Sequence, residues 1–253
     1  MRNLLDLSGK KALVTGGSRG IGNCLAQGLH DAGAEVVIFY RNTCADGLAE
    51  KMGAGGPPVH AVQCDVSDRD ALQAGVQAAA DALGGRIDIL VNAAGINRRF
   101  SLEEFPVEDW EAVIDTNLNA AVYCTQMVGK LMLAQGYGRV INLASLNSFV
   151  AGKRVGAYVA SKGGVAQITK AFANEWGGRG VHVNAIAPGY IKTDMTVALQ
   201  ENEAAYRSIL ERIPLGRWGT PADLVAPVLL LASDASDYIN GIVMPIDGGY
   251  LVT

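Results

Sequence analysis

Ser145, Tyr158 and Lys162 have the types and the spacing of a proton-transfer centre. Tyr158 and Lys162 stand four residues apart in YVASK, so a helix would place both on one face. A free tyrosine, with a pKa of about 10, is a poor base at neutral pH, and a neighbouring ammonium group favours its phenolate form. Ser145 precedes the tyrosine by thirteen residues and can hydrogen-bond a reacting oxygen. The three residues predict acid–base chemistry on an alcohol or a ketone.

A glycine-rich stretch near the N-terminus, TGGSRGIG at 15–22, predicts a phosphate-binding turn. It follows a short apolar run, and its glycines allow the backbone to turn tightly and approach a pyrophosphate. The helix expected after it offers free N–H groups and a positive end to the same anion. The residues expected to contact a dinucleotide here are Gly16, Ser18, Arg19, Gly20, Ile21 and Gly22.

The end of the second apolar run favours one form of the dinucleotide. An acid at this position bonds the ribose 2′-hydroxyl of NAD, whereas an arginine accommodates the 2′-phosphate of NADP. The chain has Arg41 there and no acid, and Arg19 adds a second cation. We therefore expect NADP(H) to be favoured, with NAD(H) possible. Asp65 is placed to accept from the adenine amino group, and Asn92 is expected near the adenosine ribose.

Short apolar runs alternate with helix-like segments along the chain. Seven runs predict strands at 12–16, 35–40, 59–64, 87–93, 139–145, 181–188 and 242–247. Apolar residues at three- and four-residue steps predict helices at 20–32, 68–84, 107–135, 156–177 and 221–232. This alternation predicts an α/β fold: a single-domain, Rossmann-like three-layer sandwich with a seven-stranded parallel sheet over residues 1–253. The segment at about 190–215 interrupts the rhythm, and we expect it to be a substrate lid.

Composition excludes several classes of protein. Charged residues make up 18% of the 253 residues and the net charge is −4, so we expect no general affinity for nucleic acid or an anionic membrane. No apolar run approaches the roughly 18 residues of a membrane helix, and the N-terminus lacks a signal peptide's long apolar centre. A cytoplasmic protein is the default expectation. The four cysteines and three histidines show no metal-binding spacing, so no metal is predicted.

The chain resembles the short-chain dehydrogenase/reductase family over about residues 10–250. The resemblance is carried, in order, by TGGSRGIG, NAAG, TNL, Ser145, Tyr158-x-x-x-Lys162 and APGYIKT. It implies a catalytic tetrad in which Asn117 holds a water that relays protons from Lys162. One departure is Ala93, where the family more often has a second asparagine. The cofactor contacts expected beyond the glycine turn and Arg41 are Asp65, Val66, Asn92, Ala93, Gly95, Tyr158, Lys162, Pro188, Gly189, Ile191 and Thr193.

The second half of the chain is more closely similar to 2-deoxy-D-gluconate 3-dehydrogenases and gluconate 5-dehydrogenases, which act on sugar acids. Segments such as AGINRRFSLEEF, ANEW and RIPLGRWG carry this likeness. Cations cluster in the loops after the fourth to sixth strands, where an anionic substrate would bind. The resemblance to deoxygluconate enzymes leans toward NAD, whereas the arginines lean toward NADP. The expected substrate contacts are Arg98, Arg99, Ser145, Asn147, Arg154, Tyr158 and Tyr190.

Two other functions remain open. Reduction of a 3-oxoacyl group on a carrier protein would use the same tetrad and NADPH, although LMLAQGYG at 131–138 carries no cation for docking an acidic carrier. A dinucleotide-sensing regulator without catalysis would not need the complete tetrad. Family likeness also implies a homotetramer. Small residues that could allow close contact between subunits are Ala120, Ala121, Gly129, Gly163 and Gly164.

Overall fold

A single seven-stranded parallel sheet forms the centre of the protein in a computed structural model, which describes residues 4–42 and 47–253. The strand order is β3-β2-β1-β4-β5-β6-β7. Successive strands are therefore added to one side of β1 up to β3 and to its other side from β4 onward, so the order reverses between β1 and β4. The bounds of the strands are β1 Lys11–Thr15, β2 Glu35–Tyr40, β3 Val59–Gln63, β4 Ile89–Asn92, β5 Gly138–Leu143, β6 Val181–Pro188 and β7 Val243–Ile246. The predicted fold class is confirmed.

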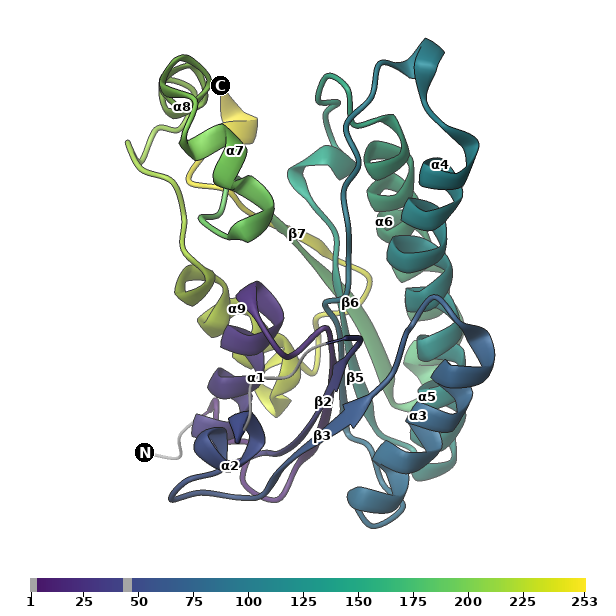
Figure 1. The fold of residues 1–253 in the computed structure, drawn as a ribbon. Coiled ribbons are helices and arrows are strands. Elements are labelled where there is room, and N and C mark those ends of the chain that lie inside the picture. The colour runs from purple at the N-terminus through teal and green to yellow at the C-terminus, as the bar shows by residue number, and fades with distance from the viewer. Residues whose placement is uncertain (1–3, 43–46) are drawn as a thin grey trace.

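Helices cover both faces of the sheet, giving three layers (Figure 1). The helices on one side are α1 Gly20–Asp31, α2 Leu48–Met52 and α9 Val225–Ala232. Those on the other are α3 Arg69–Ala82, α5 Ala120–Gln135 and α6 Gly156–Trp176, with α4 Val107–Ile114 running into α5. Two short helices, α7 Val197–Gln200 and α8 Glu203–Leu210, stand beyond the sheet near the C-terminus (Figure 1).

The sheet buries side chains on both faces because successive residues of a strand point to opposite sides. In β1, Ala12 and Val14 pack in the core under α1 and α9, whereas Leu13 packs in the core under α3 and α5. All three are fully buried. Strands covered twice must be apolar almost throughout, which explains the continuous Val, Ile and Leu runs that predict them.

Polar side chains cap two of the helix starts. Asp68 caps α3 by accepting hydrogen bonds from the N–H groups of Asp70 and Ala71, both at 2.9 Å. Thr220 and Asp223 form a reciprocal capping box around Pro221. The turn that follows is a 3-10 helix at Pro221–Leu224, which leads into α9, so the helix predicted at 221–232 changes type after its first turn.

The segment predicted as one helix at 107–135 is divided, which corrects that prediction. A π-helical turn, Asp115–Asn119, lies between α4 and α5. Such a turn inserts one residue into the helix and is frequent at functional sites. The apolar periodicity on its two sides is regular enough to conceal the insertion. The short helix α2 was not predicted, and Cys44 lies outside the described residues.

At two of the small residues expected at a subunit contact, the space beside the backbone is occupied by side chains of the same chain. A Cβ on Gly129 would come within 2.4 Å of the Trp176 ring, and one on Gly164 within 2.8 Å of Leu118. A Cβ on Gly163 would meet nothing within 4 Å. Among residues 4–42 and 47–253, no helix has both the length and the apolar character that crossing a bilayer would require.

A chain of buried amides and hydroxyls crosses the middle of the molecule. Asn92 Nδ2 donates to Asn142 Oδ1 on the neighbouring strand at 2.8 Å and to Thr125 Oγ1 on α5 at 3.0 Å. Asn142 Nδ2 donates in turn to Thr169 Oγ1 on α6 at 2.9 Å. All four side chains are almost fully buried. The network therefore ties β4, β5, α5 and α6 together where no water competes.

Replacing Asn142 with leucine should reduce the free energy of unfolding by about 1–3 kcal/mol, because the substitution leaves a buried donor of Asn92 without its acceptor and the buried Thr169 Oγ1 without its donor. Urea unfolding followed by circular dichroism measures the change. Asn174→Leu, at an exposed position of α6, is the matched control. Equal stability of the two variants would contradict the role assigned to the network.

Candidate active site

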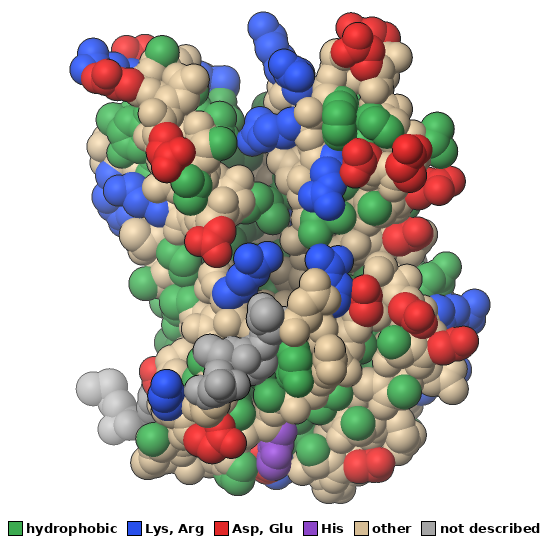
Figure 2. Space-filling view, viewed as in Figure 1, with side chains coloured by type: hydrophobic (Ala, Val, Ile, Leu, Met, Phe, Trp, Pro, Cys, Tyr) green, Lys and Arg blue, Asp and Glu red, His purple; other side chains and the backbone are tan. Residues whose placement is uncertain are grey.

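A cleft of about 490 Å³ opens at the carboxyl edge of the sheet. Its walls come from the glycine turn, from the ends of β2 to β6 and from the segment after β6. Figure 2 shows this face hollowed between two lobes, with Lys and Arg side chains on both sides of the hollow. The predicted site residues all line the cleft except for Asn92, Arg99, Asn117, Asn147, Arg154 and Tyr190.

The glycine turn forms a cradle that only missing side chains allow. A Cβ on Gly22 would lie 2.2 Å from the carbonyl oxygen of Gly16, and Gly16 itself has a φ of +65°. Helix α1 starts at Gly20 with Arg19 at its N-cap, without a side-chain cap and without an acid in its first turn. Its first N–H groups therefore remain available to an anion. This geometry fits the pyrophosphate of a dinucleotide.

The adenosine end of the cleft has the predicted cations. Arg41 is exposed beyond β2 and forms no ion pair with any residue in 4–42 or 47–253. Arg19 lies 3.8 Å from Asp194, measured from Nη1 to Oδ2. Asp65 lines the same end, and its Oδ1 accepts from the N–H and the hydroxyl of Ser67 at 3.0 and 2.7 Å. This binds Asp65 into a turn and fixes the direction of its carboxylate.

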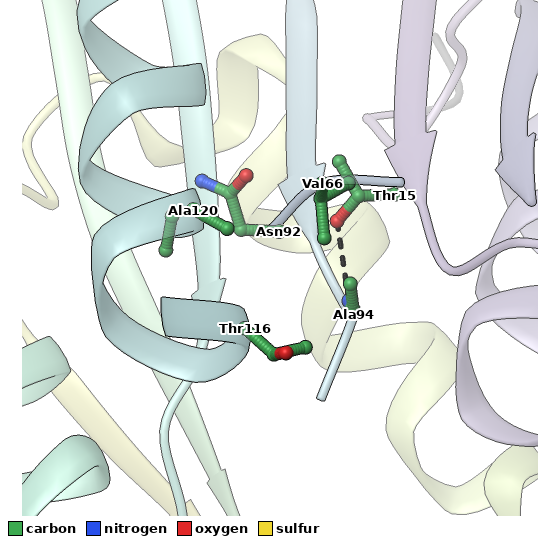
Figure 3. Close-up of a pocket in the computed structure, with 7 residues that line it drawn as sticks. Thr15, Val66, Asn92, Ala94, Thr116 and Ala120 are labelled. Atoms are coloured by element: carbon green, nitrogen blue, oxygen red, sulfur yellow. Dashed lines mark hydrogen bonds between the residues drawn. The ribbon is translucent and has the colours of Figure 1, made fainter. Parts of the chain in front are cut away.

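The structure places Asn92 beneath the cleft, where its side chain belongs to the buried network described above. The expectation that Asn92 lies near the ribose is therefore wrong for its side chain. Its Oδ1 has no hydrogen-bond partner among the described residues. A small cavity of about 10 Å³ lies against it, bordered also by Thr15 and Thr116 (Figure 3). The hydrogen bonds to Thr125 and Asn142, which the sequence does not reveal, hold the Asn92 side chain away from the cleft.

Thr15 holds the start of the turn that carries Ala93. Its Oγ1 accepts from the N–H groups of Ala93 at 3.0 Å and Ala94 at 3.1 Å, as the dashed line to Ala94 shows (Figure 3). These bonds fix the backbone that forms one wall of the cleft. The alanine in place of the more usual asparagine therefore leaves this turn well supported.

Lys162 is buried at the inner end of the cleft. Its Nζ donates to the carbonyl oxygen of Leu143 at 2.6 Å, and burial lowers the pKa of the ammonium group to about 8. The same nitrogen lies 5.6 Å from the centroid of the Tyr158 ring. Helix α6 thus places both side chains on one face, as their spacing predicts. The carbonyl at the end of β5 fixes the position of the cation.

Tyr158 and Ser145 meet across the same end of the cleft. Burial raises the pKa of the Tyr158 phenol, and a hydrogen bond with Ser145 acts in the opposite direction. The expected lowering of this pKa by Lys162 does not offset the effect of burial, and the ammonium group is directed to the Leu143 carbonyl. The Ser145 hydroxyl also accepts from the N–H of Asn147 at 3.1 Å. The phenol is therefore held in its protonated form at neutral pH.

Asn117 supports the wall of the cleft from behind. Its Oδ1 accepts from the N–H of Ile96 at 2.8 Å, and its Nδ2 donates to the Ile96 carbonyl at 2.9 Å and to Ser161 Oγ at 3.1 Å. The side chain is 2% exposed. The π-helical turn directs it to these partners. Its amide is fully engaged by protein groups, so it positions the backbone next to Lys162.

The predicted substrate residues separate into two groups. Arg98 lines the cleft, but its Nε pairs with Asp109 at 3.0 Å. Arg99 is exposed and has no ion pair with a described residue, and its charge acts to lower the pKa of Tyr190. Arg154 is also exposed and is unpaired among described residues, with a φ of +61°. The structure therefore leaves Arg99 and Arg154, and not Arg98, free to meet an anion.

Tyr190 belongs to an aromatic cluster behind the rim of the cleft. Its ring packs against Trp218 at 5.2 Å and Tyr250 at 5.3 Å between centroids. Burial and the neighbouring Tyr250 raise the pKa of Tyr190 to about 12. Arg212 lies over the Tyr250 ring at 4.1 Å. The cluster joins the segment after β6 to the C-terminal turn, so Tyr190 is a packing residue here.

Some residues of the site were missed by the sequence. The cleft is also lined by Ile96, Asn97, Thr116, Asp194, Met195 and Thr196. Thr116 precedes Asn117 in TNL, and Asn97 follows shortly after NAAG. Their closeness to these motifs was the sequence signal that could have identified them. The Leu143 carbonyl carries no sequence signal because every residue has one. Among the described residues, no group of three or more His, Cys, Asp and Glu side chains is arranged to hold a metal ion.

A parallel sheet with a glycine cradle at its reversal point and a tyrosine–lysine–serine centre beyond it defines a dinucleotide-dependent oxidoreductase. A family model described as enoyl-(acyl carrier protein) reductase matches residues 16–251. The chain belongs to the short-chain dehydrogenase/reductase family.

The relatives include enzymes of sugar acids. A 2-dehydro-3-deoxy-D-gluconate 5-dehydrogenase of Pseudoalteromonas atlantica is 45% identical over 99% of both chains. The crystal structure of a gluconate 5-dehydrogenase from Burkholderia cenocepacia, in complex with NADP and tartrate, is 38% identical with a TM-score of 0.95, covering 99% of this chain and 98% of that one. A short-chain type dehydrogenase/reductase from Mycobacterium marinum is 35% identical with a TM-score of 0.92, over 99% and 98%.

The tyrosine of the site should ionise late. Because burial raises the pKa of Tyr158, its tyrosinate absorbance should develop only above pH ~10, the usual value for a free phenol. The near-ultraviolet difference between the wild type and Tyr158→Phe, titrated without cofactor, isolates this one group. Tyrosinate already present at pH 8 would show that the lysine governs the phenol after all.

Proposed function

We propose that this protein interconverts a secondary alcohol and a ketone on a sugar acid such as gluconate or a deoxygluconate, with NADP(H) as the favoured cofactor. The observation that carries the proposal is the convergence of Ser145, Tyr158 and Lys162 at one end of a cleft whose other end is a glycine cradle. The names of the relatives support the substrate class.

The side chains divide the acid–base work. A nicotinamide bound in the cleft supplies or accepts the hydride. Tyr158 donates its hydroxyl proton to the carbonyl oxygen in reduction and takes it back in oxidation. Ser145 donates a hydrogen bond to the same oxygen. A phenol that is protonated at neutral pH is already in the form that reduction needs, whereas oxidation requires its ionisation first.

Lys162 and Asn117 set the environment of the phenol. The Lys162 ammonium group, with its pKa near 8, is charged at neutral pH and stabilises negative charge on Tyr158 as the proton leaves. Asn117 fixes the backbone at Ile96, which forms the wall facing the lysine. We propose that these four residues form the catalytic centre, with Asn117 acting by positioning.

The cleft fits a phosphorylated dinucleotide. Arg41 and Arg19 are two cations at its adenosine end, and β2 ends without the acid that would select the 2′-hydroxyl of NAD. The solved relative with bound NADP supports the same preference. The similarity to deoxygluconate enzymes suggests NAD, but the residues that line the cleft include no acid at the end of β2 to bind the 2′-hydroxyl of NAD.

The substrate end carries cations suited to a carboxylate. Arg99, next to the cleft-lining Arg98, and Arg154 are exposed and unpaired among the described residues, whereas Arg98 is paired with Asp109. An unpaired guanidinium can bind a carboxylate through two parallel hydrogen bonds. We therefore propose Arg99 as the first candidate for the carboxylate contact. The segment 190–215, which includes α7 and α8, would close over the substrate as a lid.

Reduction of a carrier-bound 3-oxoacyl group is the second candidate, and the description of the matching family model is the observation that favours it. A panel of sugar acids, their keto forms and an acetoacetyl thioester, each tested with NADP(H) and NAD(H), separates the two. The absorbance of reduced nicotinamide is the readout. We expect turnover of gluconate-type substrates; faster turnover of the thioester would overturn the proposal.

Replacing Tyr158 with phenylalanine should lower kcat by about 100-fold or more, the usual contribution of a positioned acid–base group. The affinity for NADPH, measured by nicotinamide fluorescence, should survive, since the substitution removes one oxygen. Tyr238→Phe, at a fully exposed position, is the control. Retained activity in the Tyr158 variant would refute its role.

Replacing Arg41 with alanine should raise the KM for NADP(H) by about 10-fold, since a hydrogen bond to a charged group contributes about 1.5–3 kcal/mol. The KM for NAD(H), which lacks the 2′-phosphate, should change far less. Arg179→Ala, at an exposed position preceding β6 on the opposite edge of the sheet, is the control. An equal rise for both cofactors would show that Arg41 does not read the phosphate.

We also propose a cytoplasmic homotetramer, on the strength of the family resemblance. Gly163 on α6 is open to close approach. Exposed apolar side chains lie at the start of α4 and in the segment between β5 and α6: Leu102, Val107, Phe149 and Val150. Sedimentation equilibrium gives the number of subunits directly, and a monomer at micromolar concentration would contradict the assembly.

A further inference from the structure

One ion pair spans the mouth of the cleft. Arg19, in the turn between β1 and α1, approaches Asp194, in the segment after β6, with 3.8 Å between Nη1 and Oδ2. Both side chains line the cleft and both are 81% exposed. Since β4 and β5 lie between β1 and β6 in the sheet, the contact passes over the strand ends where a dinucleotide would lie.

The pair engages a cation that the cofactor would also require. Asp194 is the one carboxylate among the described residues that pairs with Arg19, and Arg19 is one of two cations offered to a 2′-phosphate. At 3.8 Å the contact is an ion pair without a hydrogen bond. A phosphate group, with its larger charge and three acceptor oxygens, is the stronger partner for a guanidinium. The phosphate and Asp194 cannot both hold this side chain in the same geometry.

We propose that Asp194 is a specificity-determining residue that competes with the cofactor's 2′-phosphate for Arg19 and so weakens NADP(H) binding without weakening NAD(H) binding. The inference rests on the proposed use of Arg19 in cofactor binding. Asp194 thereby reduces the preference for NADP(H) over NAD(H) that Arg19 and Arg41 create. It also links the phosphate to the segment that carries α7 and α8, because a bound phosphate releases Asp194 from the glycine turn.

The size of the effect follows from the exposure of the pair. Solvent-exposed ion pairs contribute about 0.2–1 kcal/mol, so removing the competitor should tighten NADPH binding by a factor of roughly 1.4 to 5. The difference should fall at high salt, because the screening length is about 3 Å at 1 M ionic strength. The affinity for NADH should not change, since it has no 2′-phosphate for Arg19 to bind.

The experiment is a double-mutant cycle read by the dissociation constants of NADPH and NADH. Asp194→Asn keeps the shape of the side chain and removes its charge, and Arg19→Ala removes the contested group. We expect Asp194→Asn to tighten NADPH binding in the wild type and to have no effect in the Arg19→Ala background. Glu201→Gln, which neutralises an exposed acid on the same segment, should leave both constants unchanged.

Three results would overturn the proposal: no change in NADPH affinity with Asp194→Asn, an equal change for NADH, or a change that persists without Arg19. The last would indicate general repulsion of the cofactor by a negative charge. Failure of the underlying function is distinguishable, because wild-type protein that binds neither dinucleotide would refute the cofactor assignment itself. Circular dichroism and the melting temperature confirm that each variant is folded.

Discussion

The hydrogen bond from the Lys162 ammonium group to the Leu143 carbonyl is the contact on which the site depends. It joins the N-terminal third of α6 to the last residue of β5, and so sets how the helix lies on the sheet. Tyr158 is four residues before Lys162 on that helix, and Ser145 is two residues beyond Leu143 on the loop. One bond thus fixes the relative positions of the acid, its hydrogen-bond partner and the cation. Because the ammonium group is almost fully buried, breaking this bond would leave a charge without compensation.

The cofactor end depends on a different constraint, the absence of side chains. The backbone at Gly22 approaches Gly16 so closely that no Cβ fits between them. The close approach turns the first N–H groups of α1 toward the cleft, where they supplement the charge of Arg19 and Arg41. A protein with a net charge of −4 thereby presents cations and free N–H groups together where phosphate groups would lie.

The sequence predicts the sheet, most helices and the cleft because those depend on local rules. Apolar runs covered on both faces can be little else than parallel strands, and glycines at a strand end indicate close approach of a ligand or backbone. The site details that it missed depend on backbone groups or on contacts between distant segments. The Leu143 carbonyl redirects Lys162, Asp109 neutralises Arg98, and Thr125 and Asn142 bind Asn92 below the cleft. No spacing rule reveals such partners. The π-helical turn is hidden for a related reason, since one inserted residue barely disturbs an apolar pattern.

The polar network beneath the cleft has a consequence for how the sheet assembles. The apolar side chains of β4 and β5 would pack acceptably if one strand slid along the other by two residues, because the same faces would stay buried. Asn92 and Asn142 stand opposite each other in the observed pairing, and a slide would separate them inside a dry core. The hydrogen bond between the two amides therefore favours one register of β4 against β5. The apolar neighbours stabilise the packed sheet, and the hydrogen bond between the two amides selects its register.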